Sequence, residues 1–302
     1  MKKRFKDSKT NKEITSLTKN KQERGSLIIV GTPIGNIGDF TIRAKQTLEE
    51  VDYILAEDTR NIKKLSMLVG FSYKKVIRYN ENKRLNQIPK IIDYIIYGSN
   101  VALVSDAGMP LISDPGYIIV KECIKNNIEV KTVPGPSSII SSLVVSGLPT
   151  DSFYFVGFLP KKFGSRKSIY LDLINLKTTI IVLESPKRLL RLLEELKLFF
   201  GDIEIAVIRE LTKLYEEVIR GEISSVINRL NSKTKIVGEI VVILSPLKNE
   251  DCGSLSTKEI AEMQNFLQND SLKNVVNKMV YKTGKPRNIV YKEALKINLV
   301  KK

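Results

Sequence analysis

The sequence runs VSDAGMPLISDPG over residues 104–116 and PGPSS over residues 134–138. Both segments follow short apolar runs rich in β-branched residues, and both are dense in the Gly, Pro, Ser and Asp of tight turns. Open α/β folds bind ligands on loops of this kind, at the carboxyl edge of the sheet. Two ordinary strand-to-helix turns with capping Ser and Asp residues would look the same, so these segments alone leave both interpretations open.

The residues around them alternate between short β-branched runs and longer helical patterns, which predicts an α/β fold with a parallel-rich sheet. Ser137 is a predicted N-cap for a helix over 138–145, and we place the end of a first domain, residues 25–149, just beyond it. The expected strands are 27–30, 53–56, 101–104 and 130–133, and the expected helices include 42–50, 88–97 and 117–125.

A second set of strand-like runs predicts a second α/β domain over residues 150–246, with a mixed sheet because the spacing is less regular. Its expected strands are 153–156, 179–183, 204–208 and 239–244, with 217–220 as a further candidate and a helix over 186–200. A polar linker follows. Helical patterns over 258–267, 271–280 and 288–297 predict a small helical domain within residues 255–302. Residues 1–24 are basic and lack the apolar core of a secretory signal, so we expect a disordered tail.

The net charge of +16 predicts a polyanionic partner. RNA or DNA fits better than a membrane, because no apolar run approaches the roughly 20 residues of a transmembrane helix. A Lys-rich composition that merely keeps the protein in solution is the other explanation. The two cysteines form no C-x-x-C pair or metal spacing, which is consistent with a reducing cytoplasm.

Histidine is absent from the chain. Its absence excludes Ser-His-Asp and Cys-His catalysis, a histidine general base, and zinc sites that need imidazole. We expect no metal site.

Several polar loops follow the predicted strands. The first, GTPIGN at 31–36, permits close backbone approach to a ligand but matches neither G-x-G-x-x-G nor G-x-x-x-x-G-K-[ST], which weakens dinucleotide and ATP readings. Polar and charged clusters follow at 57–60, 79–84, 184–188 and 209–217. If the sheet is parallel, these clusters converge on one rim; a structural network of ion pairs is the alternative.

The loops closely resemble motifs of the ribosomal RNA small subunit methyltransferase I family, a branch of the tetrapyrrole methylase fold. The motifs are, in order, GTPIGN (31–36), AEDTR (56–60), VSDAG (104–108), SDPG (113–116), PGPS (134–137), GLPTD (147–151), GFLP (157–160), ESP (184–186) and RELTK (209–213). The resemblance spans residues 26–244. It implies a two-domain tetrapyrrole-methylase-like fold, a homodimer, and 2′-O-methylation of a cytidine in the decoding region of small-subunit rRNA or the 30S subunit, with S-adenosylmethionine as cofactor.

The resemblance also implies that the cofactor lies in a cleft between the two α/β domains. The loops implied to lie nearest it carry Thr32, Pro33, Gly35, Ser105, Asp106, Ala107, Gly108, Ser113, Asp114, Ser137, Phe158, Leu159, Gly238 and Glu239. We expect Asp106 and Asp114 to shape the wall of that cleft rather than perform the chemistry.

A ribose hydroxyl is a weak acid, so its methylation needs a base or a nearby cation. Without histidine, Asp58 or Glu184 is the expected proton acceptor, and Arg60 and Lys213 are expected to stabilise the developing alkoxide. A desolvated, neutral Lys213 could itself be the base. These four residues could instead form a structural ion-pair network.

For RNA binding we expect a loop that carries Lys161, Lys162, Arg166 and Lys167 to contact phosphate; a merely solvated loop is the alternative. The family usually has histidine where this chain has Asn80, Asn82, Lys187 and Tyr215, so either those histidines are dispensable, which we favour, or this member is impaired. Two other functions remain open: a small-molecule, tetrapyrrole-type methyltransferase on the same fold, and a non-catalytic RNA-binding protein.

Overall fold

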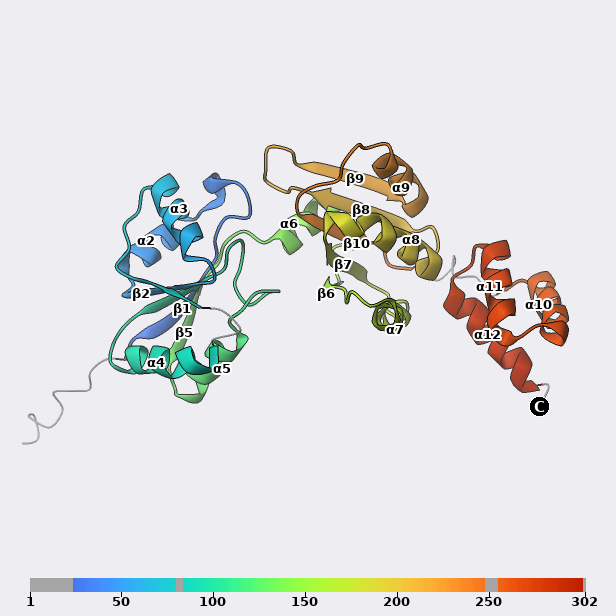
Figure 1. Ribbon diagram of the computed structural model, residues 1–302, viewed down its shortest axis with the longest axis horizontal. Helices are drawn as coiled ribbons and strands as arrows, with labels where there is room; N and C mark the ends of the chain where they lie inside the picture. Colours follow the sequence, from blue (N-terminus) through green and yellow to red (C-terminus); the bar gives the residue numbers. More distant parts are fainter. Residues whose placement is uncertain (1–23, 80–83, 248–254, 301–302) are drawn as a thin grey trace, which may run out of the picture. The chain divides into compact units, whose positions relative to one another are not determined.

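The computed structural model describes residues 24–79, 84–247 and 255–300 (Figure 1). Its internal packing divides the chain into two compact units, residues 1–136 and 137–302, and each is described by itself. The expected basic tail lies outside the described residues except for Arg24. No described helix is both long enough and apolar enough to span a bilayer.

The first unit is built on a five-stranded sheet in which every pairing is parallel. The strands lie in the order β3-β2-β4-β1-β5. Their bounds are Ser26–Val30 (β1), Tyr53–Ala56 (β2), Val76–Arg78 (β3), Val101–Val104 (β4) and Glu129–Val133 (β5). Strand β4 is buried along its whole length, because helices cover both faces of the sheet. The predicted parallel α/β sheet is confirmed.

Two hydrophobic cores flank this sheet, as the alternation of side chains along a strand requires. Leu27 and Ile29 of β1 face a core with α4 and α5, whereas Val30 faces a core with α2 and α3. Figure 1 shows these two pairs of helices on opposite faces of the sheet. The helices are Ile37–Asp39 (η1, a 3-10 turn), Ile42–Glu50 (α2), Thr59–Val69 (α3), Arg84–Ile96 (α4) and Tyr117–Lys125 (α5).

The second unit contains a mixed five-stranded sheet, as predicted, in the order β6-β7-β10-β8-β9. Strands β6 and β7 pair in parallel, and the remaining pairings are antiparallel. The bounds are Phe153–Phe158 (β6), Thr179–Glu184 (β7), Glu204–Arg209 (β8), Glu217–Glu222 (β9) and Ile240–Leu244 (β10). Strand β9 is the additional strand for which 217–220 was a candidate.

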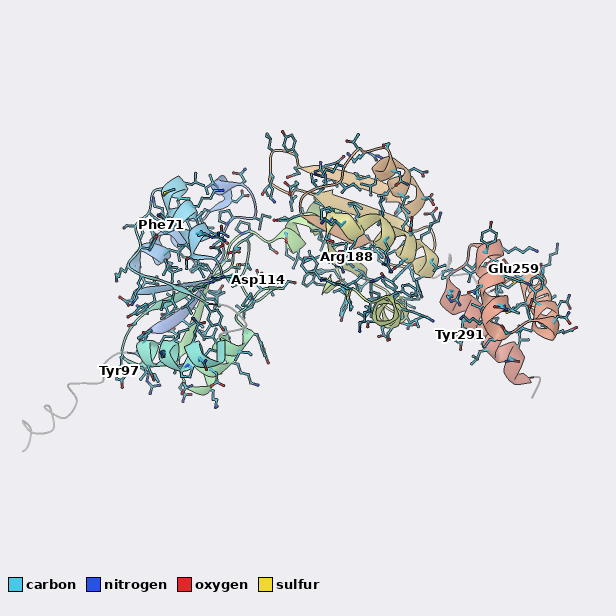
Figure 2. The ribbon with its side chains drawn as sticks, viewed as in Figure 1. Phe71, Tyr97, Asp114, Arg188, Glu259 and Tyr291 are labelled. Carbon is cyan, nitrogen blue, oxygen red and sulfur yellow. The ribbon has the colours of Figure 1, made fainter. Side chains whose placement is uncertain are left out.

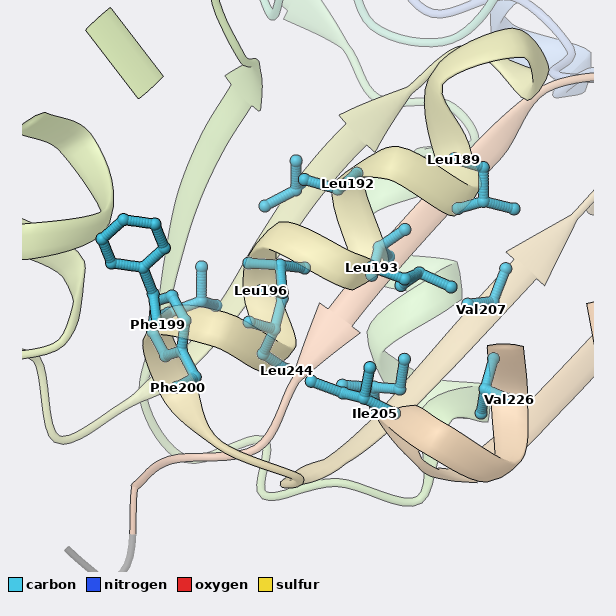
Figure 3. Packing of buried hydrophobic residues seen from close by; sticks show 14 of the residues in the cluster. Leu189, Leu192, Leu193, Leu196, Phe199, Phe200, Ile205, Val207, Val226 and Leu244 are labelled. Atoms are coloured by element: carbon cyan, nitrogen blue, oxygen red, sulfur yellow. The ribbon is translucent and has the colours of Figure 1, made fainter. Parts of the chain in front are cut away.

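Helices cover this second sheet as well. They are Ser138–Ser146 (α6), Phe163–Leu173 (α7), Pro186–Arg188 (η2, a 3-10 turn), Leu189–Phe200 (α8) and Ile223–Asn231 (α9). Helix α8 buries one whole face, including Leu189, Leu193 and Leu196, against strand residues such as Val207 (Figure 3). Helix α6 packs on the opposite face, where Leu143 joins a separate core with Ile181.

The division between the units falls earlier than the expected boundary after Pro149. Helix α6 was expected to close the first domain, but it packs on the second sheet, and the units divide between Pro136 and Ser137. The guanidinium of Arg220 on β9 also donates to the carbonyl oxygen of Ser146 at 3.0 Å. The apolar face of α6 and this capping contact attach the helix to the second unit.

The segment with the basic residues 161–167 also differs from expectation, because it is largely helical rather than a loop. Helix α7 begins at Phe163 and buries Arg166, Tyr170 and Leu173, which share one face at i, i+4 and i+7. The charged residues and Gly164 at its start hide this periodicity in the sequence.

Three helices end the described chain, as predicted: Thr257–Asn269 (α10), Leu272–Thr283 (α11) and Arg287–Val300 (α12). Ser256 forms a capping box with Glu259, and Gly284 ends α11 at a positive φ of 65°. Their shared core contains Met263, Val275, Val276, Met279, Val290 and Ala294. Cys123 is buried in the first unit, and Cys252 lies outside the described residues.

Candidate active site

The loop after β1 begins with a very close crossing of two backbones. Gly31 donates its N–H to the carbonyl oxygen of Val133 at 3.0 Å. A Cβ on Gly31 would lie 2.7 Å from the Cα of Gly135, so no larger residue fits without moving the backbone. Glycine at this position therefore serves the close approach of the β1 and β5 ends.

The next residues join this loop to the one after β4. The N–H of Thr32 donates to the carbonyl oxygen of Gly108 at 2.9 Å, and the N–H of Gly108 donates back at 3.1 Å. The Thr32 hydroxyl donates to the carbonyl oxygen of Ser105 at 3.2 Å, and the Ser105 hydroxyl to that of Ala107 at 3.2 Å. Both hydroxyl side chains are buried. Their hydroxyl groups hold the loops together.

These two loops and one helix enclose a hollow of about 320 Å³ at the carboxyl edge of the first sheet. It brings together six of the expected cofactor residues: Thr32, Pro33, Gly35, Ser105, Asp106 and Ala107. Sequence reasoning missed the helix that completes it. Asn61, Lys64, Leu65 and Leu68 of α3 line the hollow, and their i, i+3, i+4, i+7 spacing is the signal that could have found them.

Asp58 and Arg60 lie together at the start of α3. Asp58 is the N-cap, and its carboxylate accepts the backbone N–H of Arg60 at 2.9 Å. The Arg60 guanidinium also donates to this carboxylate, with an Nε–oxygen distance of 2.9 Å. These hydrogen bonds lower the pKa of Asp58 to about 2. The N–H of Asp58 donates to Asp106 at 3.3 Å, which ties the β2 and β4 loops. So acidic a carboxyl group is a weak proton acceptor, which argues against Asp58 as the base while Arg60 holds it.

Asp114 is half-buried in a tight loop after β4 (Figure 2). The adjacent Ser113 and nearby Leu111 adopt positive φ angles of 65° and 72°, which are uncommon for residues other than glycine. Burial raises the pKa of Asp114 to about 6; the hydrogen bond of Ser105 opposes the rise, and the charges of Glu57 and Asp106 add to it. Asp114 therefore lies beside the Ser105 loop, while Ser113 and Asp114 are not among the residues that line the hollow.

The two expected cofactor residues at the end of β6 differ in exposure. Gly157, at a φ of 75°, sits at a break in the register with β7, and beyond it Phe158 is exposed. Leu159 is buried in the core of the second unit. Ser137 accepts the N–H of Ile140 at 3.5 Å and caps α6, as predicted. Of Phe158 and Leu159, only Phe158 has an exposed side chain that could contact a ligand.

Glu184 is buried at the end of β7. Its carboxylate accepts the N–H of Ser185 at 2.6 Å and the Nε–H of Arg188 at 2.7 Å. Arg188 in turn donates to the carbonyl oxygen of Leu159 at 3.3 Å. The contacts of Glu184 with Ser185 and Arg188 all involve Oε1, and they place the buried carboxylate in an ion pair with Arg188, which argues against Glu184 as the acceptor of the substrate proton.

Lys213 lies in the loop after β8, between two carboxylates. Its Nζ is 3.0 Å from Glu210 and 3.2 Å from Glu239. Burial works to lower the pKa of Lys213, but the hydrogen bonds and charges of Glu210 and Glu239 outweigh it and raise the pKa. The ion pairs therefore favour a positively charged Lys213 and argue against the neutral-lysine base considered from the sequence. Glycine is favoured at Gly238, since its φ is 95° and a Cβ there would also lie 2.4 Å from the Glu210 side chain.

Among the four expected RNA contacts, Lys161, Lys162 and Lys167 are exposed. Arg166 is not: it is buried, donates to both oxygens of Glu195 at 2.6 and 2.7 Å, and donates to the carbonyl oxygen of Lys161. The predicted phosphate contact of Arg166 is therefore wrong, because its guanidinium is buried and bonded to Glu195 and to the carbonyl oxygens of Pro160 and Lys161.

The polar clusters belong to two sheets and not to a single rim. Those at 31–36 and 57–60 follow strands of the first sheet, whereas those at 184–188 and 209–217 follow β7 and β8 of the second. Of the positions where the family usually has histidine, Lys187 and Tyr215 are exposed, and Asn80 and Asn82 lie outside the described residues.

Residues 26–227 match the model of a family described as tetrapyrrole (corrin/porphyrin) methylases. A Thermotoga maritima protein named ribosomal RNA small subunit methyltransferase I is 47% identical over 73% of this chain and 98% of its own length. A protein of the same name from Hydrogenobaculum is 46% identical over 72% of this chain and 95% of its own.

Among solved structures, a uroporphyrin-III C-methyltransferase from Thermus thermophilus, complexed with S-adenosylhomocysteine, has a similar fold. The TM-score is 0.51 at 19% identity, covering 73% of this chain and 97% of that one. Together with the sequence matches, this fold supports the assignment. The chain belongs to the tetrapyrrole methylase family and, within it, to the ribosomal RNA small subunit methyltransferase I group.

Proposed function

We propose that this protein transfers the methyl group of S-adenosylmethionine to the ribose 2′-oxygen of a cytidine in the decoding region of small-subunit rRNA. The observation that carries the proposal is the hollow at the carboxyl edge of the first sheet, lined by residues 32–35 and 105–107. The names of the relatives support rRNA as the substrate class. A net charge of +16 favours this polyanion over a small tetrapyrrole.

The hollow suits this cofactor in size and chemistry. Its volume of about 320 Å³ lies at the lower end of small-molecule sites. Ile34, Ile37 and Leu65 offer apolar surface for an adenine ring, and the Asp106 carboxylate offers a partner for positive charge. When bound, S-adenosylmethionine supplies a methyl group on a sulfonium sulfur, which keeps the bonding electron pair as the methyl group leaves.

The protein then has to align the ribose hydroxyl and disperse charge as its proton leaves. Lys213, held as a cation by Glu210 and Glu239, is the proposed stabiliser of the developing alkoxide, with Arg60 as a second cation. Asp58 orients Arg60 and would accept a proton only after this pair separates. Because nearby cations lower the pKa of the hydroxyl group, its proton can pass to water.

The remaining predicted residues keep their proposed roles. Gly108, Ser113, Asp114, Ser137, Phe158, Gly238 and Glu239 are proposed near the cofactor, and Leu159 could contribute only backbone atoms because its side chain is in the core. Lys161, Lys162 and Lys167 are proposed phosphate contacts. A cytoplasmic homodimer is also a proposal.

The test has two arms. Calorimetry measures S-adenosylmethionine binding, and incubation of the protein and cofactor with small ribosomal subunits or free small-subunit rRNA is followed by mapping of 2′-O-methyl groups. We expect binding and modification of a cytidine. Binding without RNA methylation would support the small-molecule alternative, and RNA binding without cofactor binding would support the non-catalytic one.

A matched pair of variants ties the result to the hollow. Ala107 lines the hollow with its side chain exposed, so Ala107→Phe should fill it and abolish cofactor binding. Ala261→Phe makes the same change at an exposed position on α10 and should bind normally. Equal cofactor affinity in the two variants would show that the hollow is not the site.

A further inference from the structure

The loop between β8 and β9 holds two large side chains out in solvent. Leu214 is 89% exposed and Tyr215 is 70% exposed. They are the central residues of a turn closed by the N–H of Glu216, which donates to the carbonyl oxygen of Lys213 at 3.1 Å. An aromatic ring displayed in this way beside a functional lysine offers a flat apolar surface to a ligand.

The loop is held in an unfavourable conformation. Glu210 and Thr212 have φ angles of 51° and 66°, which is costly for a β-branched residue such as threonine. The N–H of Thr212 donates to the Glu216 carboxylate at 2.6 Å, and the N–H of Glu239 donates to that of Glu210 at 2.9 Å. Leu211 packs against the core below. The surrounding contacts thus fix where Tyr215 is presented, so little ordering is lost when a ligand binds.

The charges at the base of the loop largely cancel. Lys213 lies between Glu210 and Glu239, and Glu217 pairs with both Arg209 and Lys233. Such a surface does not attract phosphate strongly. What it offers is an apolar and aromatic face, and the part of an RNA that matches this face is an unstacked base.

We propose that Tyr215, with Leu214 beside it, is a platform on which a base of the RNA substrate stacks. The inference rests on the proposed function and deepens it: stacking would position the strand so that its ribose reaches Lys213, two residues away. Tyr215 is then a positioning residue, and phosphate contacts elsewhere supply the salt-dependent part of the affinity.

The experiment measures methylation of small ribosomal subunits and their affinity at several salt concentrations, using the full chain. Tyr215→Ala should raise KM and weaken RNA binding by roughly 5- to 150-fold, the effect of removing one base-stacking side chain. Because stacking involves no ion release, the slope of log affinity against log salt should stay unchanged. Tyr215→Phe, which keeps the ring, should restore binding.

Tyr97→Ala is the matched control, because Tyr97, labelled in Figure 2, is 71% exposed. It lies between α4 and β4, at the amino edge of the first sheet, whereas the hollow lies at the carboxyl edge. S-adenosylmethionine affinity and melting temperature should be the same in all variants. An unchanged KM in Tyr215→Ala, a loss confined to kcat, or an altered salt slope would overturn the stacking role. If the unmodified protein neither binds the cofactor nor methylates RNA, the proposed function is wrong. That result is distinct from failure of the stacking role, which requires an active protein whose Tyr215→Ala variant gives one of these overturning results.

Discussion

Gly31 and Gly135 lie back to back where β1 and β5 end, and a Cβ on Gly31 would approach the Cα of Gly135 to 2.7 Å. The Cα and N atoms of Gly135 are backbone atoms, which cannot rotate away as the Met109 side chain can. Gly31→Ala should therefore lower the free energy of unfolding of the first unit by about 1–3 kcal/mol, the usual range for overpacking. Urea unfolding followed by circular dichroism would measure it.

Gly164→Ala is the control for this change. Gly164 lies in the first turn of α7, and no other group lies within 4 Å of the position of an added Cβ. Alanine there should stabilise the second unit by about 0.5–1 kcal/mol. Equal unfolding curves for the two variants would contradict the crowding argument.

Lys213→Met should reduce the single-turnover methylation rate about 100-fold, because it removes a charge-stabilising donor. Lys235→Met, at an exposed lysine of the same unit, should leave the rate unchanged. The carboxylates of Glu210 and Glu239 keep Lys213 protonated. The rate should therefore not climb tenfold per pH unit between pH 7 and 9, as it would if neutral lysine were the base. Such a climb would restore the base role.

Asp114→Asn should stabilise the protein in a pH-dependent way. The folded pKa of Asp114 is about 6, above the ordinary 3.8, so its stabilising contribution is complete below about pH 4 and is lost as pH rises through 6. At pH 7.5 the Asn variant should gain about 1–2 kcal/mol, allowing for partial exposure, and the gain should shrink towards pH 4. Thermal melts across pH would measure this, with Asp151→Asn as an exposed control. A gain that is independent of pH would contradict it.

Replacing Lys161, Lys162 and Lys167 together by Ala should weaken RNA binding and lower the magnitude of its salt slope by about 2. Arg166→Ala should behave differently: it leaves Glu195 buried without its main partner and should cost about 3–5 kcal/mol of stability. Affinity titrations at several salt concentrations and unfolding curves separate the two effects. If the salt slope is the same in the triple variant, these lysines do not contact RNA phosphates and are simply solvated.

Much of the fold could be predicted from the sequence, because buried β-branched runs mark the strands. The bounds of α2 and α5 follow from apolar periodicity, and Ser137 caps α6 as expected. The attachment of α6 could not be predicted, since an apolar helix face does not specify which sheet covers it. The prediction of a loop at the start of α7 was wrong for a local reason: Gly164 and the neighbouring cations are typical of a loop.

Sequence motifs identified the loops of the candidate site, and the surroundings of each side chain in the fold changed the roles expected for some of its residues. The loops around Thr32 and Ser105 do meet. The protonation state of Lys213 depends on partners that only the fold supplies, such as Glu239. Sequence patterns identify which residues can ionise, whereas burial and ion pairing decide which ones are available for chemistry.

The paired hydrogen bonds between Thr32 and Gly108 also bear on protein engineering. Because each loop completes the backbone hydrogen bonds of the other, neither loop should keep its conformation when it is moved alone into another protein. A designer who transplants residues 31–35 into another scaffold, or exchanges them between homologues, would need to move residues 105–108 as well.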